Sequence, residues 1–163
     1  MVATTTSTAN RDFVKQLGAD VVIDYRKDDF EKILHDYDVV LNSLGGETLD
    51  KSLRVLKPSG KLISISGPPD PKFAKDMEAS WILGLGIRLL SYRIRKKAKR
   101  HRVSYSFLFM RPSGDQLRQI SSLIDSGAIR PVVDRVFPLE GTKEALAYVE
   151  QGRARGKVIV KVR

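Results

Sequence analysis

The chain has 163 residues, of which 42% are hydrophobic and 29% charged, a composition typical of a globular protein and not of a disordered or fibrous one. It contains no cysteine, which excludes disulfides, thiolate nucleophiles and Cys-ligated zinc. Its two histidines, His35 and His101, lie far apart in the sequence, so we expect no metal site. Seven of the cations behind the net charge of +10 fall between Arg93 and Arg102, so the charge is local.

The sequence offers no segment that would carry the chain into or across a membrane. Its first residues, MVATTTSTANRDF, lack the apolar core of a secretory signal. The longest apolar stretch, Trp81–Leu90, is interrupted by Gly84, Gly86 and Arg88 and is too short to cross a bilayer. We therefore expect a cytoplasmic protein without a membrane span.

Short β-rich runs alternate with segments of helical periodicity along the whole chain, the pattern typical of a βαβ protein. The predicted strands are Val2–Thr5, Val21–Ile23, Asp38–Asn42, Lys61–Ser66, Ser104–Phe109, Val132–Phe137 and Lys157–Val162. Apolar residues recur at helical spacing in three groups, which are Phe13, Val14 and Leu17, then Phe30, Ile33 and Leu34, then Leu49, Leu53 and Leu56. Ser113 and Gln116 form a capping box for a helix that ends near Gly127, and a last helix is predicted from Thr142 to Gln151.

This order of elements predicts an α/β fold, a doubly wound parallel sheet of the Rossmann type with helices on both faces. The sheet should be ordered around the Val21, Val39 and Ile63 strands. Ligands in such sheets bind beyond the carboxyl ends of the strands. The residues directly after each strand are therefore the candidate functional residues.

The first predicted strand is followed by small hydroxyl side chains and no acid. In a dinucleotide-binding fold, an Asp or Glu at the strand end beside the adenosine ribose would accept from the 2′-hydroxyl and repel a 2′-phosphate. Here small hydroxyl side chains, Thr6 and Ser7 among them, with Arg11 close by, could instead donate to a phosphate. An alternative is that Ser7 or Thr8 simply caps a helix that begins near Ala9, and both roles can coexist.

Long segments of the sequence, in the family's order, resemble the quinone-oxidoreductase branch of the medium-chain dehydrogenases/reductases, which are also described as zinc-type alcohol-dehydrogenase-like. The segments are TTTSTANRDFVKQLGADVVIDY, DYDVVLNSLGGETLDKSLRVLKPSGKLISISG and RPVVDRVFPLEGTKEALAYVEQGRARGKVIVKV. The similarity covers nearly the whole chain. It implies an NADP(H)-dependent oxidoreductase that transfers a hydride to a small-molecule quinone, enone or carbonyl.

The resemblance also implies a cofactor site. Thr6, Ser7 and Tyr25 would surround the adenosine end of NADP(H), with the Tyr25 phenol near the 2′-phosphate. The remaining contacts would be Leu44 and Gly45 at the nicotinamide ribose, Ser66 and Gly67 beneath the nicotinamide, and Phe107, Leu108 and Phe109 at the carboxamide. Many relatives carry a Lys where this chain has Asn10, so the preference for NADP(H) rests on the missing acid and on Arg11.

The residues alone also allow purely structural roles for several of these positions. Gly45 and Gly46 can form a simple turn, and Phe107 with Phe109 can be strand packing. Tyr25 is a stronger candidate because it is an aromatic residue directly after an apolar strand.

Parts of the family that would complete an enzyme are missing from this sequence. No GxGxxG follows a strand, since Gly84 and Gly86 lack the required third glycine. The N-terminal catalytic domain is also missing, so we expect 1–130 to be a partial dinucleotide-binding domain and 131–163 a segment that in the family returns to the catalytic domain. No pair of residues forms a nucleophile and base, so no catalytic residue is assigned, and the chain alone should oxidise little NADPH.

Two other functions are consistent with parts of the sequence. DYDVV followed by a helix and VLKPSGKLISIS also occurs in S-adenosylmethionine-dependent methyltransferases, although their acidic glycine-rich loop is absent. A non-catalytic module could instead bind an anionic membrane surface or nucleic-acid phosphates through the cations that follow an apolar helical face. That apolar face is formed by Trp81, Ile82, Leu85, Leu89 and Tyr92. We favour instead a helix that covers a substrate cleft or subunit interface, and we expect no specific nucleic-acid partner.

The strand Ser104–Met110 is apolar for a segment at the outer edge of a sheet, where unpaired backbone groups seek another strand. Related enzymes commonly join two subunits through this edge strand, so we expect a homodimer. The alternative is that the preceding helix folds over the edge and hides it.

Overall fold

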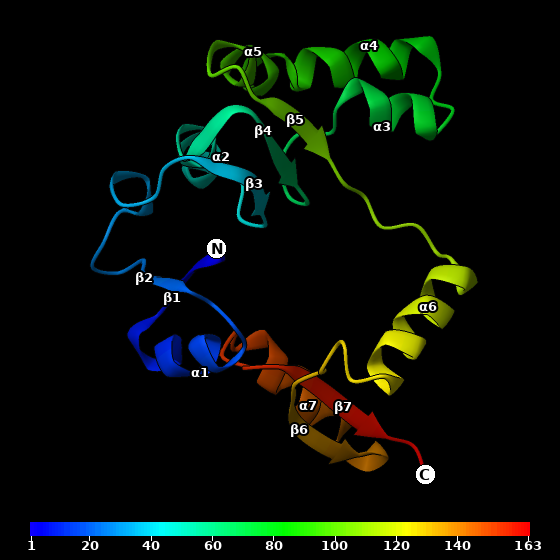
Figure 1. Ribbon diagram of the computed structural model, residues 1–163. Helices are drawn as coiled ribbons and strands as arrows, with labels where there is room; N and C mark the ends of the chain where they lie inside the picture. The colour runs from blue at the N-terminus through cyan, green and yellow to red at the C-terminus, as the bar shows by residue number, and fades with distance from the viewer. The chain divides into compact units, whose positions relative to one another are not determined.

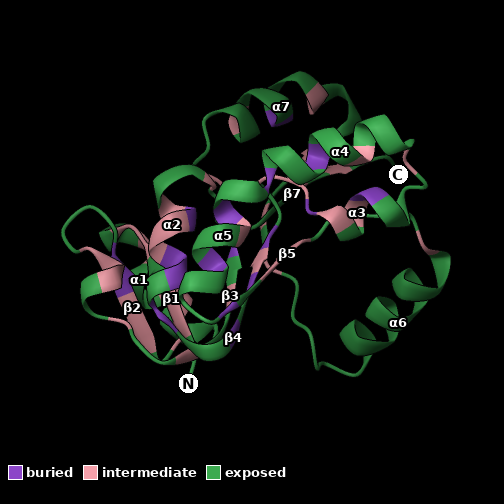
Figure 2. Cartoon of the chain, turned by 90° about the horizontal axis from the view of Figure 1, so that it is seen from above, coloured by how far each residue is buried: buried purple, intermediate pink, exposed green.

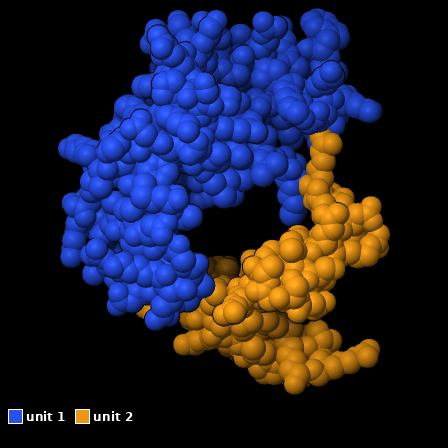
Figure 3. All heavy atoms as spheres, viewed as in Figure 1, with its two compact units in different colours: residues 1–110 blue, residues 111–163 orange.

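The computed structural model describes all 163 residues, which divide into two compact units, Met1–Met110 and Arg111–Arg163 (Figure 3). The strands are β1 (Ala3–Thr6), β2 (Val21–Asp24), β3 (Tyr37–Asn42), β4 (Leu56–Ser64), β5 (Ser104–Phe107), β6 (Val133–Pro138) and β7 (Lys157–Lys161). The helices are α1 (Arg11–Gln16), α2 (Gly46–Arg54), α3 (Pro71–Asp76), α4 (Trp81–Leu90), α5 (Tyr92–Arg100), α6 (Gly114–Asp125) and α7 (Thr142–Glu150) (Figure 1). Short 3₁₀ turns are η1 (Thr8–Asn10), η2 (Phe30–Lys32) and η3 (Leu139–Gly141).

Every strand pairs in parallel, as the alternation of strands and helices predicts. β1 pairs with β2, β4 lies between β3 and β5, and β6 pairs with β7, which gives three separate sheets instead of one continuous sheet. Parallel neighbours need a crossover connection, and α1, α2 and α7 provide it between β1 and β2, β3 and β4, and β6 and β7. The fold is the expected mixed α/β, Rossmann-like arrangement.

The break between the β1–β2 sheet and the β3–β4–β5 sheet has a simple topological description. A doubly wound dinucleotide-binding sheet has the strand order 3-2-1-4-5-6. If strand 1 is left out of that order, strands 3 and 2 remain on one side and strands 4, 5 and 6 on the other. In this chain the first group corresponds to β2–β1 and the second to β3–β4–β5. A groove of about 410 Å³, here called the central groove, is lined on one side by Val2–Thr5 and on the other by Val39–Leu44. The sheet is therefore interrupted at its centre.

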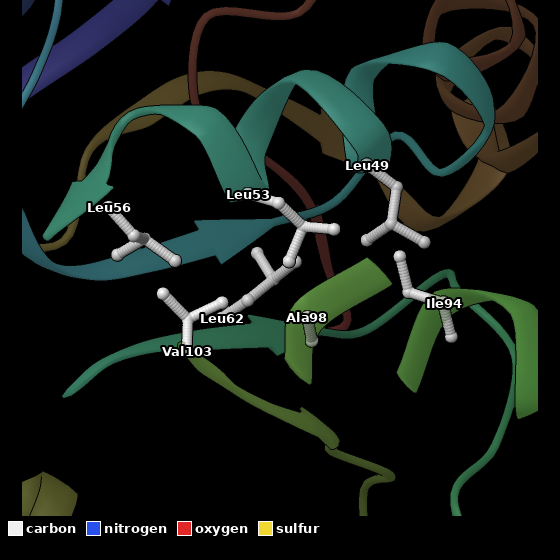
Figure 4. Packing of buried hydrophobic residues seen from close by; sticks show 7 residues of the cluster. All are labelled: Leu49, Leu53, Leu56, Leu62, Ile94, Ala98 and Val103. Carbon is white, nitrogen blue, oxygen red and sulfur yellow. The ribbon is translucent and has the colours of Figure 1, made fainter. Parts of the chain in front are cut away.

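The core of unit 1 forms where α2 and α5 pack on one face of β4. Leu62 of β4 is fully buried, and Leu53 of α2 is 1% exposed. Leu49 and Leu53 lie one helical turn apart and so reach the same face, where Ile94 and Ala98 of α5 meet them (Figure 4). Leu56 and Val103 complete this cluster.

The opposite face of the same sheet carries exposed apolar side chains. Val39 and Leu41 of β3, together with Ile65, are at least half exposed. Figure 2 shows buried residues in β4 and in the helices α2 and α5. Right-handed crossovers on one side of a switch point place their helices on one face, which explains why α2 and α5 lie together. Covering of this half on one face is the arrangement that a doubly wound fold produces.

Two of the predicted helical groups need correction. Phe30, Ile33 and Leu34 form only the 3₁₀ turn η2, a segment too short to repay the cost of nucleating an α-helix. Leu56 is not on α2 but opens β4, because α2 ends at Arg54. In contrast, the Ser113 cap is confirmed, since its hydroxyl accepts from the Gln116 N–H at 3.3 Å.

Unit 2 consists of the β6–β7 pair with α6 and α7. α7 packs on this pair, and Ala145 is its buried residue. The Tyr148 hydroxyl donates to Asp134 at 2.7 Å, and the Arg135 guanidinium lies 4.4 Å from the centre of the Tyr148 ring. The helix predicted after the capping box is present as α6. Its apolar side is exposed, however, and the Leu117 side chain is 64% exposed.

Leu53→Ala should destabilise the chain by about 2–5 kcal/mol, because the lost methyl groups leave a cavity under β4. Urea unfolding followed by far-UV circular dichroism measures this loss. Leu17→Ala serves as the control, since Leu17 is 56% exposed and its truncation should change stability by about 0.5 kcal/mol or less. Equal losses at the two positions would contradict the assigned core.

Candidate functional site

The carboxyl ends of β1, β2 and β3 meet at one pocket of about 600 Å³. Thr5 lies in β1, Tyr25 directly follows β2, and Leu44 follows β3, and all three line this pocket. Its other walls are Arg26, Lys27, Asp28, Asp29, Phe30, Glu47, Thr48 and Lys51. The crevice beyond the strand ends at a switch point is where doubly wound folds bind ligands.

Tyr25 and two cations that follow it form one wall of the pocket. The Tyr25 side chain is 57% exposed, and the Arg26 guanidinium lies 5.8 Å from the centre of its ring. Lys27 comes next in the chain. The wall therefore offers an aromatic surface for a planar group beside positive charge for an anion.

Lys51, the third cation of the pocket, is already neutralised. Its ammonium lies 2.9 Å from Asp29, 3.1 Å from Glu47 and 3.9 Å from Glu31. The hydrogen bond to Asp29 is the main cause that raises the pKa of Lys51, and the same bond holds the pKa of Asp29 below its ordinary value. Arg26 and Lys27 are therefore the cations that can meet an anionic ligand.

A buried carboxylate fixes the end of β2 next to this wall. Asp24 is 8% exposed and accepts hydrogen bonds from the Thr8 hydroxyl and, at 3.1 Å, from the Arg26 backbone N–H. These two bonds, with that of Thr8 the stronger cause, lower the pKa of Asp24 although burial opposes them. The connection after β1 and the turn after β2 are thus joined through one ionised side chain.

The hydroxyls after β1 do not act as helix caps. The Thr8 hydroxyl is committed to Asp24, and Ser7, at the start of η1, makes no side-chain capping hydrogen bond. The Tyr25 N–H donates to the Thr6 carbonyl at 3.2 Å, which keeps the ends of β1 and β2 together. The capping alternative is therefore not observed, and Thr6 lies next to Tyr25 through this backbone bond.

The loop from β3 to α2 is shaped by Gly45. Its φ of 66° and ψ of −163° lie in a region open essentially to glycine alone. The Gly45 N–H donates to the Asn42 side chain at 3.1 Å, and Asn42 in turn donates to Ser52 of α2 at 3.3 Å. This arrangement holds the N-terminus of α2, the positive end of its dipole, beside Leu44 in the pocket.

The loop after β4 lies against the Gly45 loop. A Cβ atom at Gly45 would stand 3.4 Å from the Ser66 carbonyl oxygen. At Gly67, a Cβ atom would stand 2.7 Å from the Tyr105 hydroxyl and 2.8 Å from the Ser64 hydroxyl, so packing alone requires glycine there. The Leu44–Gly45 and Ser66–Gly67 loops therefore adjoin.

Tyr105, beside Gly67, is a fixed hydrogen-bond donor. Burial and, second, the negative charge of Asp70 raise the pKa of Tyr105 to about 12. Its hydroxyl donates to the Pro68 carbonyl at 2.6 Å. The phenol stays protonated at physiological pH and ties the loop after β4 to β5.

The three residues expected at the carboxamide lie at the carboxyl end of β5. Phe107 and Phe109 pack edge-on against Phe73 of α3, with ring centres 5.3 and 5.5 Å apart. Leu108 is 57% exposed, and its N–H donates to the Ser64 carbonyl at 2.9 Å. The aromatic pair has the packing role that the sequence alone allows, and Leu108 is the member with an exposed side chain.

Of the eleven expected cofactor residues, two line the pocket, Tyr25 and Leu44. Arg11 begins α1 and lies outside it. The other eight follow strands or lie at their ends but are also not among the lining residues, namely Thr6, Ser7, Gly45, Ser66, Gly67, Phe107, Leu108 and Phe109. Sequence reasoning missed Arg26 and Lys27. Two consecutive cations directly after a strand that ends in an aromatic residue were the signal that could have identified them.

Comparison with known proteins decides the family. Residues 17–160 match the zinc-binding dehydrogenase family. The chain belongs to this family. The mitochondrial NAD(P)H oxidoreductase RTN4IP1 of Danio rerio is 36% identical over 159 residues, which cover 91% of this chain and 39% of that protein. The chloroplastic NADPH-dependent alkenal/one oxidoreductase of Arabidopsis thaliana is 31% identical over 161 residues, 98% of this chain and 33% of that protein.

Solved structures of other proteins share the fold. The quinone oxidoreductase from Coxiella burnetii superimposes with a TM-score of 0.76 at 26% identity, over 100% of this chain and 45% of that one. The chain thus spans less than half the length of these relatives. Nearly all of it is nevertheless matched, which agrees with the resemblance seen in its sequence segments.

The family name implies zinc, but this chain's residues do not fit a zinc site. It has no cysteine, and no three His, Asp or Glu side chains come together in a group that could hold a metal ion. None of the helices is both long and apolar enough to cross a membrane.

Asp24→Asn should make the chain less stable at neutral pH and flatten its acid unfolding. Because the pKa of Asp24 is lowered from 3.8 on folding, its contribution is fully present above about pH 4 and is lost as the pH falls through the folded-state value. Urea unfolding at a series of pH values checks this, with Asp12→Asn on exposed α1 as control. An unchanged acid dependence in Asp24→Asn would contradict the assignment.

Proposed function

We propose that this chain is the cofactor-binding part of an NADP(H)-dependent oxidoreductase. The observation that carries the proposal is the pocket at the carboxyl ends of β1, β2 and β3, which lies beside the break in the sheet. It combines the exposed Tyr25 ring with the cations Arg26 and Lys27, and no acid stands at the end of β1. The names of the relatives, NAD(P)H and NADPH-dependent oxidoreductases, support the same cofactor.

The residues present fit the adenosine end of NADP(H). Tyr25 would lie against the adenosine, with Thr6 and Ser7 donating to the 2′-phosphate. Arg26 and Arg11 would supply positive charge from the two sides of this strand end. An acidic residue here would favour NAD(H), and Asp24 does not take that role because its carboxylate is turned to Thr8 and the Arg26 N–H.

The remaining loops would hold the nicotinamide half. Leu44 and Gly45 are proposed at the nicotinamide ribose and Ser66 and Gly67 beneath the ring, since these two loops adjoin. Phe107, Leu108 and Phe109 are proposed at the carboxamide, with contacts from the Leu108 side chain and the backbone because the Phe rings pack against α3. The bound cofactor would supply the hydride, and this chain would supply its orientation.

The substrate is proposed to be a small activated alkene, quinone or carbonyl compound. Relatives are named for alkenal/one and 2-methylene-furan-3-one reduction, and a structural neighbour for quinone reduction. The Tyr105 phenol is not proposed as a proton donor, because its hydroxyl donates to the Pro68 carbonyl. The methyltransferase alternative is not favoured, since the relatives cited are oxidoreductases.

A cytoplasmic location stays a prediction. The relatives from Danio rerio and Arabidopsis thaliana are named mitochondrial and chloroplastic, so they do not share one compartment. Fractionation of cells that express the tagged protein would decide the location.

Binding of the cofactor's adenosine half tests the proposed function directly in this chain. We expect 2′,5′-ADP to bind more tightly than 5′-AMP, because only the first carries the 2′-phosphate. Arg26→Asp should reduce that preference about tenfold or more, since a cation is replaced by a repelling charge. Isothermal titration calorimetry at low salt measures both affinities.

The control for this experiment is Lys15→Asp, which makes the same charge change on α1 away from the pocket. Arg11→Asp, tested in parallel, shows whether the residue at the start of α1 also contributes. If 2′,5′-ADP and 5′-AMP bind equally, or if Lys15→Asp weakens 2′,5′-ADP as much as Arg26→Asp does, the assigned phosphate site is wrong.

A homodimer through the Ser104–Met110 segment is also proposed. β5 is an edge strand, and Leu108, Phe109 and Met110 are 57%, 56% and 86% exposed. The Phe107 N–H, however, donates to the Asp70 side chain at 3.2 Å, so part of the edge is already occupied. The contact would therefore depend on apolar side chains as much as on backbone pairing.

Sedimentation velocity at micromolar concentrations should show a dimer that Phe109→Asp with Met110→Asp converts to a monomer. Placing like charges on both sides of a two-fold contact is strongly unfavourable. Leu17→Asp, on α1, is the control because Leu17 is equally exposed. A monomeric parent chain, or a dimer that survives the double substitution, would refute this interface.

A further inference from the structure

The helix α4 is apolar but turned mostly toward solvent. Four of its large side chains, Trp81, Ile82, Leu85 and Leu89, are between 51% and 79% exposed. They occupy the side of the helix opposite Ile87, its one buried residue, which is 8% exposed. α4 contacts its neighbours α3 and α5, and this apolar side is left without a partner in the chain. Helices that are apolar on their outward side mark an interaction site.

α5, which follows α4 directly after Ser91, carries positive charge on its outward side. Ile94 and Ala98 face the core, which turns Tyr92, Lys96, Lys99 and Arg100 outward. The Lys96 ammonium lies 5.6 Å from the centre of the Tyr92 ring, so the cationic and aromatic parts are contiguous. We call the combined surface the α4–α5 face and define it by Trp81, Ile82, Leu85, Leu89, Tyr92, Lys96, Lys99 and Arg100.

No acidic residue offsets this charge in the neighbouring sequence. Between Glu78 and Asp115 the chain contains no Asp or Glu but nine Lys or Arg residues. One of these, Lys97, is ion-paired with Asp50 at 2.5 Å, on the side of α5 that meets α2. Arg95 donates to the Arg88 carbonyl at 3.0 Å and keeps its charge. The α4–α5 face therefore carries cations and no acidic residue of its own.

We propose that the α4–α5 face binds the surface of membranes that contain anionic phospholipids. An apolar helical side would enter the boundary between headgroups and acyl chains, and the cations of α5 would meet the lipid phosphates. Trp81 at one end of α4 and Tyr92 just beyond its other end are the residue types that favour this boundary. The chain would lie on the membrane without crossing it, in agreement with the absence of a spanning helix.

Charge distinguishes this occupant from a second copy of the chain. An isologous contact would bring two such cationic surfaces together, which electrostatic repulsion disfavours. Nucleic acid would neutralise the cations but would leave the apolar side of α4 uncovered. An anionic lipid surface satisfies both parts of the face. The proposal does not depend on cofactor binding by the pocket at the strand ends.

Trp81 is the single tryptophan of the chain, so its fluorescence reports directly on this face. We expect its emission to shift to the blue on adding vesicles of phosphatidylcholine with about one-third phosphatidylserine. Vesicles of phosphatidylcholine alone should produce little shift. Raising the salt concentration from about 0.05 to 0.5 M should weaken binding in a cosedimentation assay, because the cations then lose most of their attraction.

Two sets of variants separate the apolar and cationic contributions. The triple substitution Lys96→Gln, Lys99→Gln and Arg100→Gln should lower the vesicle partition coefficient about 100-fold, at about fivefold for each cation. The matched control removes three exposed cations elsewhere, Lys15→Gln, Lys32→Gln and Lys143→Gln. Leu85→Ser with Leu89→Ser should also weaken binding, and both positions are more than half exposed, so the fold is retained. Circular dichroism verifies each variant.

Several results would overturn the proposal. Equal binding to neutral and anionic vesicles would show that the cations take no part, and equal losses in the triple variant and its control would show that position is irrelevant. A blue shift that grows with protein concentration without lipid would identify a second copy as the occupant. Salt-sensitive binding to duplex DNA without binding to anionic vesicles would identify nucleic acid.

Discussion

The burial of one face of β4 under α2 and α5 is the interaction on which the site depends. Leu62 meets Leu53 there, and two residues further along the strand Ser64 lies on the same face. The Ser64 hydroxyl accepts from the Gly67 N–H at 2.8 Å, and its carbonyl receives the Leu108 N–H. Packing at the middle of the strand therefore fixes the loops at its end, where the nicotinamide half of the cofactor is proposed.

Much of the fold could be predicted from local pattern because strands and helices have different periods. The seven strands, the parallel pairing and the Ser113 cap all followed from residues close together in the sequence. The prediction of an α-helix at Phe30 failed for a local reason, since the segment lacks the length that a stable helix needs. Periodicity thus located the buried side of α2, but it predicted neither the short length of the Phe30 segment nor the exposure of the α6 stripe.

The candidate site could be predicted only in outline. Topology indicates that the residues after β1, β2 and β3 converge, and the pocket contains Tyr25 and Leu44. Topology cannot indicate which charged side chains form ion pairs. Lys51 pairs with Asp29 and Glu31, which lie about 20 residues earlier in the sequence, as well as with a glutamate of its own helix. For the same reason the Thr8–Asp24 bond, which joins residues 16 positions apart, left no local signal. Ion pairing between distant elements thus decides which cations of a basic chain remain available to bind an anionic ligand.

The central groove has a consequence for how the chain behaves in concentrated solution. β1 and β3 each pair on one side only, so backbone donors and acceptors line the groove without strand partners. Such unpaired edges can form backbone hydrogen bonds with any extended polypeptide, including partly unfolded copies of the same chain. This pairing would promote aggregation. The net charge of +10 opposes this through mutual repulsion between molecules. The chain should therefore aggregate most readily in solutions where salt or polyanions screen that charge.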